Sequence, residues 1–146
     1  MGISFTDHAS RRELSLEECR THLEQAKWAR LLVTVRCLPA ARPVPVTVLG
    51  QSVLVATDES VVWEAVAHRE VLTVNVDGYL DEGIAWTVSA SGVGRPIGSD
   101  DPVLALRDGD PFWTFHRLGG RILQIPLTVL VGDETDWRYR HDVTEA

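Results

Sequence analysis

The first run of apolar side chains follows the spacing of a helix. Apolar or small residues recur along one face of residues 16–26, which is the pattern of a half-buried helix. Just before this run, Ser15 and Glu18 have the spacing of a capping box, in which the serine hydroxyl accepts from the N–H of residue 18 and the glutamate accepts from the serine N–H. The pattern therefore predicts a helix that ends near Lys27.

From Arg30 onwards the pattern changes to that of β-strands. Residues 31–35 are apolar and mostly β-branched, which is typical of a buried strand. The segment 42–50, RPVPVTVLG, predicts a strand whose start has one free edge, because its prolines have no N–H to donate to a neighbouring strand. A turn at Gly50-Gln51 leads into residues 52–57, so these two segments predict a hairpin.

The rest of the chain alternates short helices with strands. Ser60 is suited to cap the first of these helices, because its hydroxyl can accept from a free N–H of the first turn. In chain order we expect a helix over 58–68, a strand over 71–76 that ends at the turn Asp77-Gly78, a long strand from residue 84, a short helix over 100–106 that breaks at 108–111, and one or two strands over 121–131 around Pro126.

The glycines of residues 84–98, IAWTVSASGVGRPIG, raise the question of a nucleotide-binding turn. A dinucleotide-binding loop needs a helix directly after its glycines, because the helix N-terminus holds the pyrophosphate. Pro96 disfavours a helical conformation at Arg95, so no helix is expected there. The segment instead predicts one long strand, in which the glycines permit a bulge or a sharp bend of the sheet.

Strands outnumber helices in this reading, and tight turns join most neighbouring segments. This order favours an antiparallel β-barrel with short helices at its ends over a doubly wound sheet. The 146 residues have the length of one domain. We expect a mainly β domain over residues 14–133, an N-terminal arm over 1–13 and a charged C-terminal tail over 134–146.

The composition argues against several classes of function. The formal net charge is −7, whereas binding to a nucleic-acid backbone needs a basic surface, so no nucleic-acid partner is expected. No apolar run is long enough to span a bilayer, and the N-terminus lacks the apolar core of a signal peptide. We therefore expect no membrane partner and a cytoplasmic location. Cys19 and Cys37 are expected to be reduced, buried thiols.

The residue pattern alone contains no catalytic or metal-binding motif. The five histidines show neither H-x-H nor H-E-x-x-H spacing, so no metal site is expected. The serines lack the G-x-S-x-G spacing of a nucleophile elbow. Five tryptophans are present. Such rings mostly fill cores or subunit interfaces, but Trp86 or Trp113 would also suit the wall of a slot for a planar ligand.

Four segments, in this order, carry a resemblance to a known family: LSLEECRTHLEQAKWARLLVTV, RPVPVTVLGQSVLVATDES, VLTVNVD with GIAWTVSASGVGRPI, and RILQIPLTVLVG. Together they cover about residues 14–133. The ordered set resembles the pyridoxamine 5′-phosphate oxidase-like family of flavin-binding split barrels, in particular its small actinobacterial-type members. The resemblance implies a six-stranded antiparallel split barrel that forms a homodimer, with flavin mononucleotide (FMN) in a groove at the subunit interface.

The same resemblance implies a set of cofactor-binding residues: Arg42, Pro43, Val44, Thr57, Ser60 and Trp86. The first three would lie on a strand beside the flavin ring. The two hydroxyl residues would face the phosphate, and the tryptophan would occupy the position of the family's tryptophan. Hydroxyls and an arginine suit a phosphate, and strand amides can bond the polar edge of a flavin.

One departure from the family concerns the phosphate end of this site. Many members place a lysine or arginine directly after the serine, whereas this chain has Val61-Val62 there and Asp58-Glu59 before the serine. Two carboxylates near a phosphate are unfavourable. Arg42 or Arg69 would have to compensate.

Two classes of function follow from the resemblance. The first is an FMN-dependent oxidoreductase that transfers a hydride to or from a small organic substrate, with the flavin carrying the chemistry. The alternative is a non-catalytic protein on the same barrel that binds or senses a flavin, a deazaflavin or a haem, or one that has lost its cofactor, since a fold does not determine a function. No catalytic side chain is singled out in either case.

Overall fold

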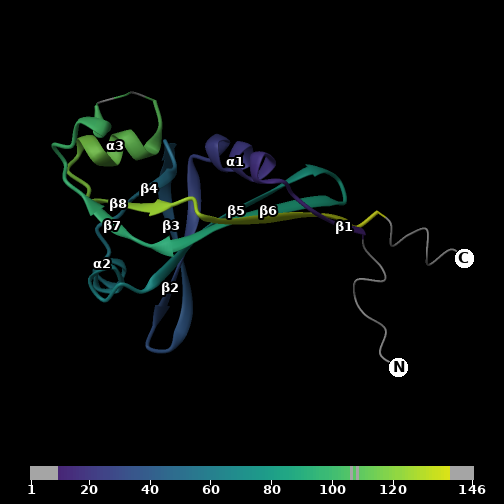
Figure 1. Cartoon of the computed structure of the whole chain (residues 1–146), viewed down its shortest axis with the longest axis horizontal. Helices are drawn as coiled ribbons and strands as arrows, with labels where there is room; N and C mark the ends of the chain where they lie inside the picture. Colours follow the sequence, from purple (N-terminus) through teal and green to yellow (C-terminus); the bar gives the residue numbers. More distant parts are fainter. Residues whose placement is uncertain (1–9, 106, 108, 139–146) are drawn as a thin grey trace, which may run out of the picture.

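The computed structural model describes residues 10–105, 107 and 109–138, and its strands form one antiparallel sheet (Figure 1). The sheet has nine strands in the order β1-β9-β6-β5-β2-β3-β4-β8-β7. In chain order the elements are β1 (Ser10–Glu13), α1 (Leu16–Gln25), β2 (Trp28–Val35), β3 (Leu38–Leu49), β4 (Ser52–Ala56), α2 (Ser60–Ala67), β5 (Val71–Asp81), β6 (Ile84–Val93), β7 (Arg95–Ile97), the 3₁₀ helix η2 (Pro102–Leu104), α3 (Pro111–Arg117), β8 (Ile122–Pro126) and β9 (Val129–Asp136).

The prediction of a mainly β, antiparallel fold is confirmed, but the predicted number of six strands is wrong, because nine are present in the described residues. Ser10–Glu13, in the expected N-terminal arm, pairs as β1 with the end of β9. The segment 84–98 is divided into β6 and β7, and the segment 121–131 contains both β8 and the start of β9. Residues 1–9 and 139–146, in the expected arm and tail, lie outside the described residues.

Gly94 turns the chain from one half of the sheet to the other. β6 pairs with β5 and β9, whereas β7, directly after Gly94, pairs with β8. A Cβ at Gly94 would stand 3.2, 3.3 and 3.4 Å from side-chain atoms of Leu123, Leu72 and Val66, so a residue without a side chain suits this bend. Because β7 follows Gly94 in place of a helix, the predicted bend is confirmed and a phosphate-binding turn is excluded at this position.

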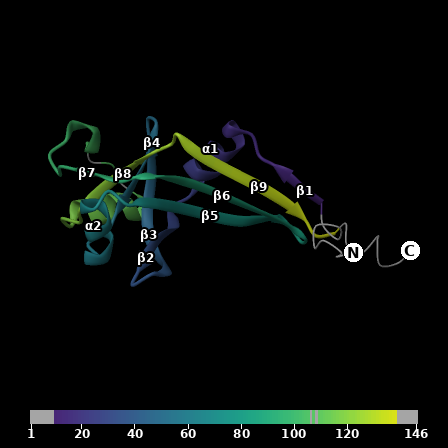
Figure 2. The same cartoon turned by 60° about the horizontal axis from the view of Figure 1, so that its bottom comes forward.

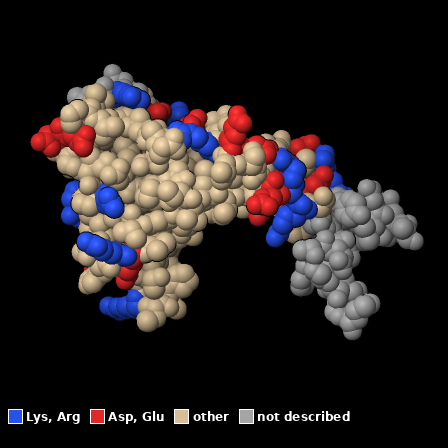
Figure 3. Space-filling model, in the orientation of Figure 1, with Lys and Arg blue, Asp and Glu red and all other residues tan. Residues whose placement is uncertain are grey.

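The long strands β5, β6 and β9 extend away from α2 and β7 towards β1 (Figure 2). Ion pairs hold the far end of this extension. Arg138 pairs with Asp136 at 3.0 Å and with Asp81 at 3.4 Å. Charged side chains gather at this end in the space-filling view, whereas the centre of the same view is largely uncharged (Figure 3).

The predicted capping box of α1 is confirmed. The Ser15 hydroxyl accepts from the Glu18 N–H, and the Glu18 carboxylate accepts from the Ser15 N–H, both at 3.1 Å. Arg12 of β1 donates to both Glu18 oxygens at 3.0 and 2.8 Å and to Glu134 of β9 at 3.1 Å. The hydrogen bonds from Arg12, followed by those from Ser15, lower the pKa of Glu18 to about 2. The cap therefore also attaches α1 to the β1–β9 edge.

The start of β3 has a free edge, as its prolines predict. β3 pairs with β2 from Leu38 to Pro45, but its pairing with β4 begins only at Val46. The Val46 N–H donates to the Lys27 carbonyl on the β2 side at 3.1 Å. The N–H and C=O groups of successive residues point to alternate sides of a strand. Since those of Val46 point towards β2, the carbonyls of Pro43 and Pro45 point towards the free edge. That edge therefore presents carbonyl acceptors without N–H donors at these two positions.

The helix N-cap predicted at Ser60 is wrong. α2 begins at Ser60 itself, and Glu59 occupies the N-cap without a side-chain hydrogen bond to the helix. The Thr57 hydroxyl accepts from the Glu59 N–H at 3.2 Å. The threonine, three residues earlier than the predicted cap, thus directs the chain into the helix.

Two predicted breaks are also wrong. Asp77-Gly78 lies within β5, because it pairs with Thr87 and Trp86 of β6. The hairpin turns at Gly83, whose φ is +97°. Pro111, expected in a break, is the first residue of α3, where proline is tolerated because the first N–H groups of a helix have no helical partner. Of the helix predicted over 100–106, the described residues form only η2.

Both cysteines are free thiols, but only one is buried. Cys19 lies in the core, whereas Cys37 is exposed. Arg36 and Cys37 form the turn between β2 and β3 and both have a positive φ, 51° and 65°. The prediction of a buried thiol is wrong for Cys37, because a two-residue hairpin turn projects its side chains from the sheet.

The apolar core has two parts. The larger part is inside the curved sheet beneath α1 and α2, and the smaller part, which includes Phe112 and Trp113, lies beneath α3. Trp113 is therefore a core residue. None of the helices described is long and apolar enough to cross a membrane. The described residues hold no group of three or more side chains arranged to bind a metal ion.

Candidate functional site

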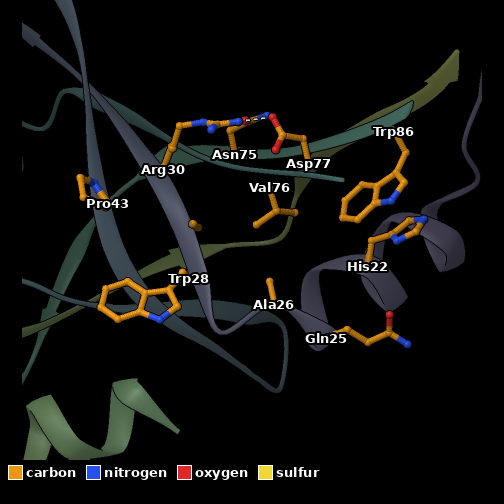
Figure 4. Close-up of a pocket in the computed structure, with 11 residues that line it drawn as sticks. His22, Gln25, Ala26, Trp28, Arg30, Pro43, Asn75, Val76, Asp77 and Trp86 are labelled. Atoms are coloured by element: carbon orange, nitrogen blue, oxygen red, sulfur yellow. Dashed lines mark hydrogen bonds and ion pairs between the residues drawn. The ribbon is translucent and has the colours of Figure 1, made fainter. Parts of the chain in front are cut away.

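Two hollows lie next to each other where β2 begins, and Trp28 and Pro43 line both of them. The first, the gap hollow, exists because the β2–β5 ladder contains only Arg30–Leu32 opposite Thr73–Asn75, so the strands separate before Arg30. The end of α1 closes the space between them. The gap hollow has a volume of about 400 Å³, and its lining includes His22, Trp28, Arg30, Pro43, Asp77 and Trp86 (Figure 4).

A pair of stacked rings forms one wall of the gap hollow. The Trp86 indole lies on the His22 imidazole with ring centroids 3.8 Å apart and an interplanar angle of 18°. A Cβ at Gly78, the cross-strand partner of Trp86, would stand 2.8 Å from the indole. The absence of a side chain at Gly78 therefore allows the indole to lie against β5. This wall is flat and rigid enough to contact a planar ligand.

Next to this wall, an ion pair joins the two separated strands. Arg30 of β2 and Asp77 of β5 form an ion pair, and both side chains are half-exposed (Figure 4). The neighbouring Asn75 amide donates to the hydroxyls of Thr87 at 2.9 Å and Ser89 at 3.0 Å. A ligand in this hollow would meet an aromatic wall and, beside it, a hydrogen-bond donor and an acceptor.

The second hollow, the loop hollow, lies between the free edge of β3 and the loop that precedes α2. It has a volume of about 460 Å³, and its lining includes Trp28, Pro43, Thr57, Asp58, Glu59 and Phe115. Trp28 and Phe115 meet edge to face with centroids 6.3 Å apart. One side of the loop hollow is therefore aromatic and apolar, and the other carries two carboxylates.

The structure brings most of the sequence-predicted residues to these two hollows. Pro43, Val44 and Thr57 line the loop hollow. Arg42 lies beside it, with its Nε 3.4 Å from a Glu59 oxygen. Trp86 belongs to the gap hollow. The exposed Ser60 lines neither of them, and the Thr57 hydroxyl already accepts a hydrogen bond within the loop.

Arg121 also lies at the loop, and the sequence pattern did not single it out. Its backbone N–H donates to Asp58 Oδ1 at 3.0 Å and its carbonyl accepts from the Thr57 N–H at 3.0 Å. Its guanidinium stands 4.3 Å from the centroid of the Trp63 ring, a cation–π contact. The only local sign of this role in the sequence was the position of an arginine directly after Gly119-Gly120, at the start of a strand.

The loop hollow suits a planar ring, and its charges are already balanced. Trp28, Phe115 and Pro43 provide flat apolar surfaces for a ring. At the polar end, Arg42 faces Glu59 at 3.4 Å and Arg121 faces Asp58 at 3.9 Å. Each arginine is thus already paired with a carboxylate. A bound phosphate would have to compete with Glu59 and Asp58 for these two cations.

No family model matches the chain, and no curated protein matches it.

Solved structures do share its fold. A FAD-binding protein from Mycobacterium smegmatis has a TM-score of 0.61 and 22% identity, with 86% of this chain and 98% of that chain covered. A FAD-binding protein from Mesorhizobium loti has a TM-score of 0.71 and 18% identity over 87% and 98%. A protein from Corynebacterium glutamicum proposed to be a pyridoxamine 5′-phosphate oxidase has a TM-score of 0.65 and 16% identity over 92% and 98%. The chain therefore has the split-barrel fold of these proteins.

Proposed function

We propose that this protein binds a flavin and acts as a flavin-dependent oxidoreductase on a small organic substrate. The observation that carries the proposal is the pair of adjoining hollows, in which Trp28 and Pro43 are walls of both. A ring in the loop hollow would therefore lie next to a second ring in the gap hollow. The flavin binding of the structural neighbours from M. smegmatis and M. loti supports this choice of ligand.

The residues of the loop hollow would hold the cofactor. Trp28, Phe115 and Pro43 would contact its ring, and the carbonyls at the free edge of β3 would accept hydrogen bonds from a ring N–H. Arg42 and Arg121 would face its phosphate. When bound, a flavin supplies the site that accepts or donates a hydride.

The residues of the gap hollow would hold the substrate. The Trp86–His22 stack would fix the plane of an unsaturated or aromatic substrate. Arg30 would donate to a carbonyl or carboxylate, and Asp77 would accept from an N–H. Orientation of this kind is the main contribution that a protein makes to a hydride transfer between two bound rings.

The absorbance spectrum of the purified protein tests the proposal. We expect flavin bands in the blue and near ultraviolet after incubation with flavin, and their loss when reduced nicotinamide or reduced deazaflavin is added without oxygen. Flavin bands that resist every reductant of this kind would indicate a carrier, and a Soret band would indicate the haem-binding alternative. A protein that remains colourless after incubation would overturn the proposal.

We also propose that two copies of the chain associate through the outer face of the sheet, with the flavin site at their interface. The register places Leu32, Thr73, Ser91 and Val129 in one row across four strands of this face. Val71, Val129 and Val131 on the same face are 66%, 54% and 60% exposed. Exposed apolar side chains gathered on one face are typical of an interaction surface.

Val129→Asp should convert the dimer to a monomer, because it would bury a carboxylate in the interface, in the row that runs from Leu32 to Val129. Analytical ultracentrifugation measures the change in mass. Val103→Asp is the matched control, since Val103 is 47% exposed but lies on η2, away from the sheet face. Two variants with the same dimer content would rule this face out as the interface.

A further inference from the structure

Two rows of side chains cross the outer face of the sheet next to the β5–β6 turn, which lies at the end of the sheet far from α2 (Figure 2). Alternate residues of a strand share a face. The first row, which we call the acidic row, runs over β5, β6, β9 and β1 and consists of Asp77, Thr87, Asp133 and Glu13. The second row is nearer the turn and consists of Tyr79, Ala85, Thr135 and Arg11.

A hollow opens beside Ala85, the smallest side chain of the second row. The side chains that line it include Asp77, Tyr79, Thr87, Asp133, Thr135 and Trp137. We call it the hairpin hollow. Its volume of about 220 Å³ equals the share of about seven molecules in liquid water. The hairpin hollow therefore suits a small molecule or the end of a long side chain.

The acidic row carries more negative charge than its neighbours balance. Asp77 is paired with Arg30 of β2. Asp133 lies directly opposite Glu13, and neither carboxylate forms an ion pair with another side chain in the described part of the chain. Like charges in directly opposite positions on neighbouring strands are unfavourable. Arg11 lies diagonally from Asp133 and can balance one of the two charges at most. The remaining negative charge beside the hollow favours a cation.

One hydroxyl of the hairpin hollow is buried without a partner. Thr135 is only 7% exposed and lines the hollow, and its hydroxyl forms no hydrogen bond with any residue that the structure describes. The Thr87 hydroxyl, in contrast, accepts from the Asn75 amide at 2.9 Å. A buried polar group without a partner is unfavourable. Since a hydroxyl can accept from a ligand N–H, Thr135 and the Asp133 carboxylate together suit a cation that carries N–H groups.

Two aromatic side chains stand at the rim of the hairpin hollow. Tyr79 is 83% exposed and Trp137 is 47% exposed, and both line the hollow. The backbone N–H of Trp137 donates to the Gly83 carbonyl at 2.6 Å, which holds this tryptophan beside the turn. The faces of tyrosine and tryptophan rings attract cations, and their apolar surface can cover an alkyl chain. The rim therefore suits an organic cation better than a hydrated metal ion.

We propose that the hairpin hollow binds an alkylammonium group, which is common to small amines and to lysine side chains. Asp133 and Thr135 accept hydrogen bonds from its N–H groups, and Tyr79 and Trp137 flank its alkyl chain. This binding requires no flavin, so it is independent of the function proposed above.

The indole N–H resonance of Trp137 in ¹H–¹⁵N NMR spectra, assigned with Trp137→Phe, tests the proposal. Butylammonium should shift this resonance in a saturable manner, whereas 1-butanol, which has the same chain without the charge, should not. Tetramethylammonium carries the charge but no N–H group, and should bind roughly tenfold more weakly because it makes no hydrogen bonds. Equal shifts with butylammonium and 1-butanol, or equal affinities for the two cations, would overturn the proposal.

Asp133→Asn removes the charge with little change of shape, and should lower the affinity for butylammonium roughly tenfold. Thr135→Val removes the hydroxyl and should lower it several-fold. Glu82→Gln is the matched control, because Glu82 is an exposed carboxylate at the same turn that does not line the hollow. Equal losses in Asp133→Asn and Glu82→Gln would indicate general attraction to an acidic surface and overturn the site, as would unchanged affinity in Thr135→Val.

A thermal melt without amine separates loss of binding from loss of folding. The melting temperature of Asp133→Asn should not fall, because the substitution removes the repulsion between Asp133 and Glu13. Nα-acetyl-lysine amide then distinguishes the two sources of the ammonium group. If it binds at least as tightly as butylammonium, the hollow accepts lysine side chains of a partner; if it binds more weakly, the ligand is a free amine. Binding of neither compound would overturn the proposal.

Discussion

Trp28→Ala should lower the affinity of the protein for a flavin about 50-fold. Trp28 lines both the gap hollow and the loop hollow, and its side chain is 51% exposed in the free protein. A buried tryptophan covers roughly 200 Å², so a bound ring would cover about 100 Å² that is now in water. At about 25 cal/mol per Å², that contact contributes about 2.5 kcal/mol, which corresponds to the expected change in affinity.

The control for this variant is another half-exposed tryptophan. Trp137 is 47% exposed and lines neither the gap hollow nor the loop hollow. Trp137→Ala should therefore leave flavin affinity unchanged in the same fluorescence titration. Equal losses in both variants, or no loss in Trp28→Ala, would place the flavin elsewhere. A thermal melt of each variant without flavin would separate weakened binding from weakened folding.

Gly132→Val should lower the free energy of unfolding by about 3 kcal/mol. Gly132 lies in β9 where α1 crosses the sheet, and a Cβ there would stand 2.8 Å from the Thr87 carbonyl oxygen and 2.9 Å from Cys19 Sγ. The carbonyl belongs to the neighbouring strand and cannot rotate away. Overpacking of this kind costs about 1–3 kcal/mol when neighbours can adjust, and a backbone contact leaves little room to do so.

Urea unfolding followed by tryptophan fluorescence measures this loss. Ala105→Val is the control, because Ala105 is exposed beyond η2 and the two added methyl groups would lie in solvent. It should change the free energy of unfolding by less than about 0.5 kcal/mol. A Gly132→Val protein as stable as the control would mean that α1 does not pack closely on β9.

Features set by neighbouring residues could be predicted from the sequence. The capping box of Ser15 and Glu18 needs only their spacing, and the bend at Gly94 follows from a glycine before a proline-containing strand. The free edge of β3 follows from proline chemistry. In each case the residues that decide the structure lie within a few positions of one another.

Features set by pairing between distant segments could not be predicted from the sequence. Asp77-Gly78 has the composition of a turn, but pairing with Thr87 and Trp86 extends the strand through it. Arg121 reaches Asp58 because β4 and β8 pair, with Ala56 opposite Ile122. No residue near Arg121 in the sequence indicates that Asp58 lies beside it. Arg121 therefore became recognisable as a residue of the candidate site only in three dimensions, whereas Arg42 was implied by the resemblance.

The prolines at the start of β3 have a consequence for which kind of molecule can use this surface. An unpaired strand edge normally recruits another extended chain, because both need alternating donors and acceptors. At Pro43 and Pro45 the edge can accept hydrogen bonds but cannot donate them. The carbonyls of an incoming peptide would therefore find no N–H donor there. The surface beside β3 thus discriminates against strand addition and remains accessible to a compact ligand whose N–H groups need acceptors.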